Sequence, residues 1–414
     1  TLREVEAAIK QLKPRKAAGL DGITNEMLKS GGQAVADALV VIFNRVWASS
    51  QFAESALVAI IKPLLKKRGN AEKPNDTRPI ALTSCLLKVF ERVVHSRLVK
   101  LAEHNGWLHD EQGGFRRLRR IEDHLFTLGV LLDTRVKSVT FVAFLDVKKA
   151  YDRIWRDGLL VKLLNQGVRG KLWMILQAMY FKVVSTVGTG EERVSFETDL
   201  GLRQGSVLSP TLFNLFIDGL IARLNETGLG IELGGKRLAC LLFADDIAIL
   251  AESAEDLQQL LNVVDQYMTE WLLQINAEKS AVVVFGRARG SVDQQIWNIG
   301  ELEIKRAKQY TYLGTTLVED GEWQLQTVKL VAMARNTSEK LAAADIVGAH
   351  VNRRAVRMLL SAFVRSTVQF AAAAVPVFAR GERENSKLLE QALAAAARAA
   401  TGARSSKGAL LETA

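Results

Sequence analysis

The sequence predicts an α+β protein, because two kinds of hydrophobic periodicity recur along its 414 residues. Residues 138–147 (SVTFVAFLDV) form an apolar run of strand length, and residues 240–250 (CLLFADDIAIL) form two short apolar runs around a turn. Apolar residues at helical spacing mark residues 209–224 and 253–272 instead. Both periods in one chain indicate helices that pack against sheets.

The remaining segments follow the same two patterns. Helical patterns also occur at residues 1–12, which open with Thr1 and Glu4 in capping-box spacing, and at 34–48, 85–103 and 148–164. A strand-loop-strand is expected at 60–82 and a hairpin at 183–198. From about residue 320 onward the pattern is helical and alanine-rich, without a sharp motif.

The composition is that of a folded, basic protein. Hydrophobic residues make up 48% of the chain, and no run approaches the ~18–20 apolar residues of a membrane span, so no membrane partner is expected. A formal net charge of +10 favours a polyanionic partner. Two cysteines cannot form a disulfide framework, which favours a reducing compartment. The chain begins with Thr-Leu-Arg and lacks a signal-peptide pattern, so we expect an excerpt of a longer protein.

Two adjacent aspartates, Asp245 and Asp246, interrupt the apolar run 240–250. Burying one unpaired carboxylate is unfavourable, and two adjacent ones also repel each other. One interpretation is a turn whose carboxylates face solvent. The other is a divalent-cation site, because a cation cancels the repulsion and takes oxygen ligands. Asp146, at the end of the run 138–147, would supply a third carboxylate if the strands are neighbours in one sheet.

Several motifs together resemble a known family. AFLDVKKAYDRIW (143–155), GLRQGSVLSPTLFNLF (201–216) and LLFADDIAIL (241–250) resemble motifs A, B and C of reverse transcriptases, in the style of non-LTR (LINE-type) retrotransposons. Further matches follow in family order: KAAGLDGI (16–23), RPIALTSCLLKVFERVV (78–94), EQGGFRR (111–117), INAEKSAVVVF (275–285) and YTYLGTTL (310–317). The ordered matches extend from about residue 16 to residue 317, which is hard to attribute to chance.

The resemblance implies a right-handed polymerase with fingers at 1–141, a palm at 142–318 that holds motifs A to E, and a helical thumb with a following segment at 319–414. The implied reaction is RNA-directed DNA synthesis from a primer 3′-hydroxyl with two Mg²⁺ ions, for which Mn²⁺ is a substitute. The implied partners are an RNA template, a DNA primer or target DNA, and dNTPs. The implied location is the nucleus and a cytoplasmic ribonucleoprotein.

The resemblance also implies the residues of the catalytic centre. Asp146 and Asp245 would ligate both metal ions, Asp246 would support them, and Val147 would offer its backbone carbonyl. Lys279 matches the motif D lysine, a candidate proton donor to pyrophosphate. An exposed loop lysine is the alternative interpretation of Lys279.

A second group of residues would hold the incoming nucleotide. Arg78 and Lys88 resemble the fingers cations that bind the triphosphate. Tyr151 falls where the family has an aromatic gate that crowds a ribose 2′-hydroxyl, although a core aromatic is the plainer interpretation. Gln204 and Gly205 would pack under the nucleotide, since glycine permits close approach of the backbone.

The nucleic acid would meet two further segments. Tyr312, Leu313 and Gly314 match the primer grip. Arg116 and Arg117 belong to a basic loop that would contact the template, although the loop lacks the Gly-Arg-Ser/Thr signature often found after its Phe-Arg.

Three alternatives stay open at this point. The first is a decayed or domesticated copy that binds nucleic acid without catalysis. The second is a reverse transcriptase of the intron-maturase or telomerase kind. The third is a structural helical protein with a metal-binding turn. The sequence contains no endonuclease motif and no zinc-knuckle cysteines, so we expect an endonuclease domain elsewhere in the full-length protein.

Overall fold

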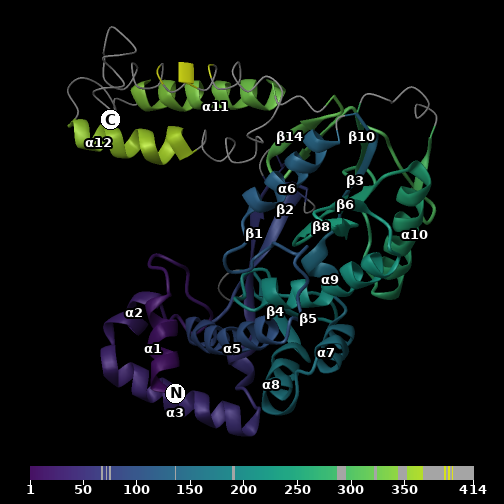
Figure 1. The fold of residues 1–414 in the computed structure, drawn as a ribbon. Helices are drawn as coiled ribbons and strands as arrows, with labels where there is room; N and C mark the ends of the chain where they lie inside the picture. Colours follow the sequence, from purple (N-terminus) through teal and green to yellow (C-terminus); the bar gives the residue numbers. More distant parts are fainter. Residues whose placement is uncertain are drawn as a thin grey trace. The chain divides into compact units, whose positions relative to one another are not determined.

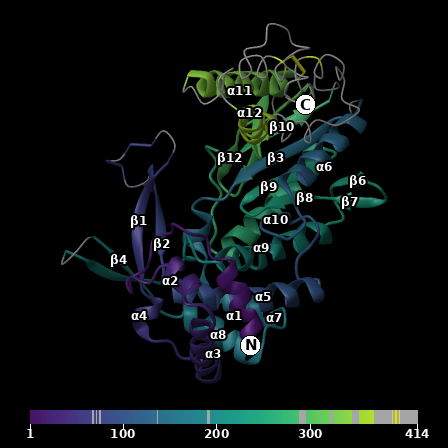
Figure 2. The same ribbon diagram turned by 90° about the vertical axis from the view of Figure 1, so that its left-hand side faces the viewer.

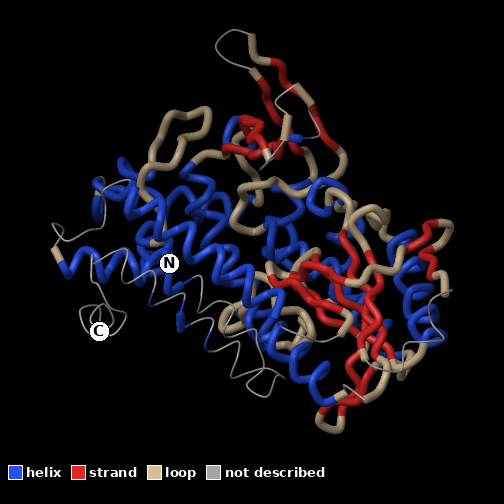
Figure 3. Tube along the Cα trace, turned by 90° about the horizontal axis from the view of Figure 1, so that it is seen from above, coloured by secondary structure: helices blue, strands red, loops and turns tan. Residues whose placement is uncertain are grey.

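Helices and strands both contribute to the chain (Figure 3). The computed structural model describes residues 1–66, 69–70, 72–73, 76–135, 137–188, 192–286, 295–320, 324–343 and 352–366, with residues 387, 390, 391 and 394. The chain divides into two compact units. Unit 1 comprises residues 1–115, 147–223 and 265–275, and unit 2 comprises residues 116–146, 224–264 and 276–414.

The predicted division into fingers, palm and thumb differs from these two units and stays a prediction. Much of the predicted thumb, residues 319–414, lies outside the described residues.

Unit 1 is mainly helical and carries one four-stranded sheet (Figure 1). Its helices are α1 (Leu2–Lys10), α2 (Asn25–Ser30), α3 (Gly32–Ser49), α4 (Glu54–Leu57), α5 (Cys85–His104), η2 (Ala150–Arg153), α7 (Arg156–Asn165), α8 (Gly170–Tyr180) and most of α9 (Ser209–Glu226). Its strands are β1 (Ala59–Leu65), β2 (Thr77–Leu82), β4 (Val183–Val187) and β5 (Val194–Thr198). The sheet has the order β2-β1-β4-β5, in which only β1 and β4 run parallel.

Helix starts in unit 1 follow local sequence signals. The predicted capping box of Thr1 and Glu4 is confirmed at the start of α1. At the start of α5, the Ser84 hydroxyl accepts hydrogen bonds from the backbone N–H groups of Leu86 and Leu87. These caps satisfy N–H groups that have no partner within the helix.

The segment after Asp146 departs from the continuous helix that its pattern predicts. Lys149 adopts a left-handed conformation (φ 51°), and the 3₁₀ helix η2 ends before α7 begins. Between η2 and α7, Trp155 forms an antiparallel bridge with Leu200. A bridge requires extended backbone, so the helix cannot pass through Trp155.

Unit 2 is built around an antiparallel sheet of order β10-β3-β9-β8 (Figure 2). The strands of this sheet are β3 (Thr140–Asp146), β8 (Cys240–Phe243), β9 (Asp246–Ala251) and β10 (Ala281–Phe285). Three hairpins pair β6 (Ile231–Leu233) with β7 (Lys236–Leu238), β11 (Trp297–Ile299) with β12 (Leu302–Ile304), and β13 (Gln309–Tyr312) with β14 (Thr315–Val318). Its helices are α6 (Ile121–Thr134), most of α10 (Ala254–Glu270), α11 (Gln324–Ala343), α12 (Arg353–Leu359) and the π-helical η4 (Leu360–Arg365).

One apolar cluster joins α6 to this sheet. Leucines of α6 pack with residues of β3, β9 and β10, among them Val142, Phe144, Leu250 and Val283. Every residue of β3 before Asp146 is buried. Because side chains of a strand alternate between faces, β3 is packed on both faces of the sheet.

The structure places both cysteines and describes the length and polarity of the helices. The thiols of Cys85 and Cys240 are both buried, and these two described cysteines form no disulfide. Among the helices that the structure describes, none has the length and apolar character required to cross a membrane.

A lysine is buried in the core of unit 1. Lys162 on α7 donates a hydrogen bond to the Phe216 carbonyl at 2.7 Å and another to the Tyr267 hydroxyl. Its ammonium also lies 3.7 Å from the centroid of the Trp271 ring. Burial, followed by the positive charge of Arg223, lowers the pKa of Lys162 to about 7.

This shift predicts a pH-dependent contribution to stability. Between about pH 7 and pH 10 the folded chain binds fewer protons at Lys162 than the unfolded chain does. The contribution of Lys162 to the free energy of unfolding therefore rises with pH across that window. The melting temperature of wild type, measured relative to that of Lys162→Met, should therefore rise as pH increases from 7 to 10. Thermal unfolding of both proteins across this range checks the prediction, and a constant difference would contradict it.

Candidate active site

Three aspartates meet at one end of the unit 2 sheet. Asp146, the last residue of β3, pairs directly with Asp246, the first residue of β9. Asp245 precedes Asp246 in a two-residue turn with Ala244. The prediction that the two strands are neighbours is confirmed, and the pairing gathers the carboxylates at one edge.

The backbone geometry brings the side chains of this pair close together. The N–H of Asp146 donates to Ser280 Oγ at 3.1 Å, and the Asp146 carbonyl accepts from the Asn276 N–H at 2.8 Å. Both backbone groups of Asp146 therefore point away from β9. Asp146 and Asp246 form a non-hydrogen-bonded pair, the type in which Cα atoms are about 4.5 Å apart and side chains are closest.

Polar groups already contact the Asp146 carboxylate. Its Oδ2 accepts a hydrogen bond from the Asn276 side-chain amide at 3.2 Å, and the Lys279 ammonium lies 3.7 Å from the same oxygen. Lys279 is 67% exposed and Asp146 is 29% exposed, so solvent weakens this ion pair. The predicted proton donor is thus within reach of the carboxylate centre.

The carboxyl of Asp246 has a raised pKa. Loss of hydration raises the pKa of its carboxyl to about 6, and the negative charges of Asp245 and Asp146 contribute in the same direction. The residue as a whole stays exposed at the strand end, so water or an ion can reach it. A positive charge at this position would reverse the repulsion.

The turn that presents Asp245 is strained. Ala244 has φ 57°, a left-handed conformation that costs a residue with a side chain roughly 1–2 kcal/mol. The side chain of Ala244 is buried. Strain of this kind persists where the surrounding structure over-determines the backbone, and it often occurs at functional sites.

The chemistry of this donor set fits a hard divalent cation. Asp146, Asp245 and Asp246 supply carboxylate oxygens, and their mutual repulsion is what a cation would relieve. Within the described ranges, no three His, Cys, Asp or Glu side chains already converge as metal ligands.

Aromatic residues support the centre from β13. Tyr310 stacks on Phe144 with ring centroids 4.6 Å apart, and its hydroxyl donates to the Lys279 carbonyl at 2.9 Å. Burial, followed by Asp246 and Asp146, raises the pKa of Tyr310 to about 12. The hydroxyl therefore stays protonated and continues to hold the backbone of Lys279.

The predicted primer-grip residues form the tip of the β13–β14 hairpin. Tyr312 is buried against Phe144, with ring centroids 5.2 Å apart. Leu313 (φ 47°) and Gly314 (φ 83°) both have positive φ, as a two-residue hairpin of type I′ requires. The Lys329 ammonium of α11 donates to the Thr316 hydroxyl at 2.8 Å, which ties that helix to the hairpin.

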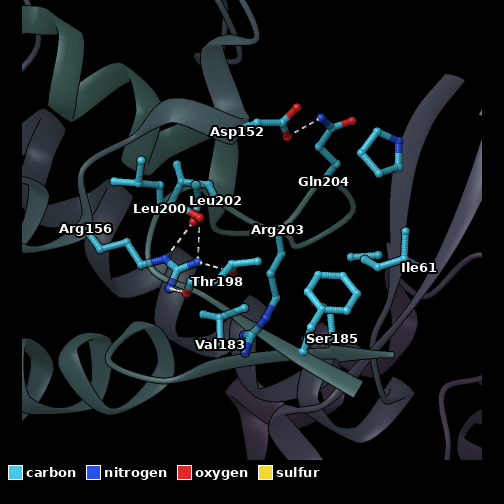
Figure 4. Close-up of a pocket in the computed structure, with 14 residues that line it drawn as sticks. Ile61, Asp152, Arg156, Val183, Ser185, Thr198, Leu200, Leu202, Arg203 and Gln204 are labelled. Carbon is cyan, nitrogen blue, oxygen red and sulfur yellow. Dashed lines mark hydrogen bonds between the residues drawn. The ribbon is translucent and has the colours of Figure 1, made fainter. Parts of the chain in front are cut away.

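Unit 1 contains a pocket of about 220 Å³ beside the motif B loop (Figure 4). Its lining comes from the four strands of the unit 1 sheet, η2, the start of α7 and the motif B loop: Ile61, Pro79, Ala81, Asp152, Arg156, Val183, Ser185, Phe196, Thr198, Leu200, Gly201, Leu202, Arg203 and Gln204. The wall is mostly apolar, with a few convergent polar groups. The volume of the pocket is below the roughly 300–1,000 Å³ of most small-molecule sites.

The predicted residues Gln204 and Gly205 lie at this loop. The Gln204 side-chain amide donates to Asp152 at 2.7 Å (Figure 4), and the backbone carbonyl of Gln204 accepts from the Ala81 N–H at 2.7 Å. Gly205 has φ 123°, and a Cβ there would lie only 2.7 Å from the Ala81 carbonyl oxygen. Only glycine permits this close approach of loop and strand.

Arg156 holds the segment that enters motif B. Its guanidinium donates to the carbonyls of Gly201 and Leu200 at 2.8 and 2.7 Å, to the Thr198 hydroxyl at 2.7 Å, and to the Thr198 carbonyl. The side chain is buried, and burial followed by the charge of Arg203 lowers its pKa to about 10. The guanidinium stays charged at neutral pH, and all four bonds are charge-assisted.

Arg203 and Glu91 fix the other end of the motif B loop. Arg203 is buried and donates to the Leu57 carbonyl at 2.9 Å. Glu91 is fully buried, accepts from the Ser206 hydroxyl at 2.8 Å and from the Val207 N–H at 3.0 Å, and has a pKa raised by burial. Arg203, to which the sequence assigned no role, is therefore a structural residue of this loop.

The other predicted nucleotide residues of unit 1 lie apart from the pocket lining. Tyr151 stacks on Phe213 with ring centroids 5.3 Å apart, which fits the core-aromatic interpretation. Arg78 on β2 is exposed and Lys88 on α5 is half-buried, and neither lines the pocket. Their predicted role in binding the triphosphate stays a prediction.

Three further predicted site residues are Val147, Arg116 and Arg117. Val147 is buried and forms an antiparallel bridge with Ile275 in unit 1. In unit 2, Arg116 is half-buried and Arg117 is exposed, within the loop before α6. Contact with the template by either arginine stays a prediction.

Comparison with known proteins identifies the family. The sequence profile of the family described as reverse transcriptase (RNA-dependent DNA polymerase) matches residues 65–317, more than half of the chain. The chain belongs to the reverse transcriptase family. This membership confirms the predicted fold class, an α+β polymerase fold, and implies a nucleic-acid template and primer and dependence on a divalent metal.

The relatives of this reverse transcriptase come from non-LTR retrotransposons, which confirms the predicted LINE-type resemblance. It is 30% identical over 330 residues to the RNA-directed DNA polymerase from mobile element jockey of Drosophila funebris, over 77% of this chain and 35% of the relative. It is 27% identical over 341 residues to the retrovirus-related Pol polyprotein from type-1 retrotransposable element R2 of Nasonia vitripennis, over 78% and 31%. The chain thus spans about a third of the length of these relatives.

Solved structures also resemble this chain, and one of them is a telomerase. Apo telomerase from Candida tropicalis aligns with a TM-score of 0.46 at 12% identity, over 92% of this chain and 69% of that one.

Sequence reasoning missed several residues of the reverse transcriptase site. Asn276 and Ser280 contact Asp146, and Arg156 and Glu91 hold the motif B loop. Asn276 and Ser280 flank the predicted Lys279 within motif D, so their position in the motif was the available signal. Nothing in the local sequence distinguished Arg156 and Glu91 from surface charges.

Replacing Arg156, which donates four hydrogen bonds, should destabilise unit 1. Arg156→Lys keeps the charge but has no planar fork to reach all the acceptors around residues 198–201, so carbonyls are left without a partner. We expect the free energy of unfolding to fall by about 2–4 kcal/mol. Urea unfolding checks this, with the exposed Arg169→Lys as a control that should match wild type. Equal stability of the two variants would contradict the prediction.

Removing the charge of Asp246 should stabilise the metal-free chain. The pKa of Asp246 is raised above its unfolded value, so its contribution to stability is lost as pH rises from about 4 to about 6. In EDTA at pH 7 to 8, Asp246→Asn should therefore melt at a higher temperature than wild type. The difference should shrink below pH 4, and a lower melting temperature for the variant at pH 7 would contradict the repulsion.

Proposed function

We propose that this chain is the RNA-directed DNA polymerase domain of a non-LTR retrotransposon, which copies an RNA template into DNA from a primer 3′-hydroxyl. The observation that carries the proposal is the side-by-side pairing of Asp146 and Asp246, with Asp245 beside them, in a chain of the reverse transcriptase family. A decayed copy that only binds nucleic acid would have no need of all three carboxylates.

The carboxylates would hold the metal ions. Asp146 and Asp245 are the ligands, Asp246 supports them, and the Val147 carbonyl completes the set. Bound Mg²⁺, or Mn²⁺ in its place, would supply activation of the primer hydroxyl and stabilisation of the leaving pyrophosphate. Lys279, now 3.7 Å from Asp146, would donate a proton to that pyrophosphate.

The motif B loop would receive the incoming dNTP. Gln204 and Gly205 present a backbone that a nucleotide can approach closely, and Tyr151 would crowd a ribose 2′-hydroxyl. Arg78 and Lys88 would neutralise the triphosphate, because phosphoryl transfer places negative charge on its oxygens. The aromatic stack on Phe213 supports this role for Tyr151 by holding its ring in one orientation.

The nucleic acid would contact basic and hairpin segments. Arg116 and Arg117 would bind the phosphates of the RNA template, and the hairpin tip at Tyr312, Leu313 and Gly314 would hold the end of the DNA primer. Contacts to phosphates release counterions, so RNA binding should weaken steeply as salt rises.

The biological setting follows from the same assignment. The enzyme would act in the nucleus and travel in a cytoplasmic ribonucleoprotein. This chain covers only about a third of the length of these relatives, which supports an endonuclease domain elsewhere in the full-length protein.

Primer extension tests the proposal directly. The purified chain, an RNA template, a DNA primer, dNTPs and Mg²⁺ should give extension products. Asp245→Asn should reduce the rate at least about 100-fold, since direct ligands matter more than the outer partners that are typically worth ~10–100-fold. A gel shift should show unchanged RNA binding.

Glu303→Gln provides the matched control. It removes an exposed carboxylate from β12 of the same unit and should extend like wild type. Retained extension by Asp245→Asn would defeat the metal-ligand assignment. A wild-type chain that binds RNA but never extends a primer would favour the non-catalytic copy.

A further inference from the structure

The end of β3 is held by a closed ring of hydrogen bonds. β10 begins at Ala281, which pairs with Phe144, so β10 offers no strand partner to Asp146. The turn just before β10 replaces that partner. Asp146 donates its N–H to Ser280 Oγ, Ser280 donates its hydroxyl to the Asn276 carbonyl at 2.9 Å, and the Asn276 N–H returns to the Asp146 carbonyl.

The same turn also orients the carboxylate. The Asn276 side-chain amide donates to Asp146 Oδ2 at 3.2 Å, so one residue fixes both the backbone and the side chain of Asp146. The turn is rigid in itself, because the Asn276 carbonyl also accepts the N–H groups of Lys279 and Ser280 at 3.1 and 3.0 Å. Ser280 is buried, which protects its two bonds from water.

A neutral amide and a cation affect metal binding by a carboxylate differently. Lys279 lies near the same oxygen but carries positive charge, which opposes binding of a second cation. The Asn276 amide orients the carboxylate without adding net charge, so the negative charge of Asp146 remains for an ion. Hydrogen-bond partners of metal-ligating carboxylates act in this way in many metal sites.

We propose that Asn276 and Ser280 are positioning residues for Asp146, which hold its carboxylate ready for the divalent metal. The proposal rests on the proposed function, because it assigns Asp146 as a ligand. It concerns the geometry of Asp146 and not contact with nucleotide or RNA. Loss of either residue should therefore weaken the response to metal and leave RNA binding intact.

The test measures metal response without nucleic acid. Mn²⁺ is titrated into the chain while the melting temperature is recorded, and ligand binding to the folded state raises that temperature. Asn276→Ala should need about 10-fold more Mn²⁺ for the same rise, and Ser280→Ala should shift in the same direction. Asn298→Ala, which removes an exposed amide from β11 of the same unit, should match wild type.

Primer extension gives the second readout. Asn276→Ala should lower kcat and raise the Mn²⁺ concentration at half-maximal rate, with KM for dNTP and affinity for RNA unchanged. If Asn276→Ala fails to fold in EDTA, as judged by circular dichroism, Ser280→Ala carries the test.

The outcomes separate this proposal from the proposed function. A wild-type Mn²⁺ response that the variants lose supports positioning even if no protein extends a primer, in which case only the proposed function fails. Variants that respond to Mn²⁺ like wild type would overturn the positioning role, whatever happens to extension. A wild-type chain whose melting temperature ignores Mn²⁺ would also overturn it.

Discussion

Like-charged carboxylates placed opposite each other at a sheet end are the constraint on which this molecule depends. Asp146 and Asp246 repel, and the pKa of Asp246 is raised to about 6 as a result of lost hydration and that repulsion. The arrangement survives because the rest of β3 is buried against α6 and its neighbouring strands. A slip of one residue would exchange the two buried faces of β3, whose side chains differ in size, so close packing favours the register that brings the charges together.

Backbone conformation near the centre is also held by its surroundings. Ala244 and Leu313 both adopt left-handed conformations that residues with side chains rarely take. Each forms part of a two-residue turn, one that presents Asp245 and one at the predicted primer grip. Strain at two such turns in one unit is typical of functional sites, where the fold stabilises conformations that isolated segments would avoid.

The motif B loop of unit 1 is organised by buried charge instead. Arg156 and Arg203 donate to backbone carbonyls, and Glu91 accepts from the loop itself. Bonds to charged groups are directional, so they fix the path of a loop that has no regular secondary structure of its own. This fixed path is what permits the close approach of Gly205 to Ala81.

Local patterns in the sequence determined most of the elements and the chemical class of the centre. Apolar runs that end in aspartate predicted β3 and the β8–β9 hairpin, because strand periodicity and turn chemistry are set by neighbouring residues. Only the tertiary structure decided which residues complete the centre. Asn276 lies 130 positions from the aspartate that it contacts, and Arg156 reaches carbonyls more than forty positions away. Contacts of that kind depend on how distant strands and loops pack, and periodicity within a short window carries no record of them.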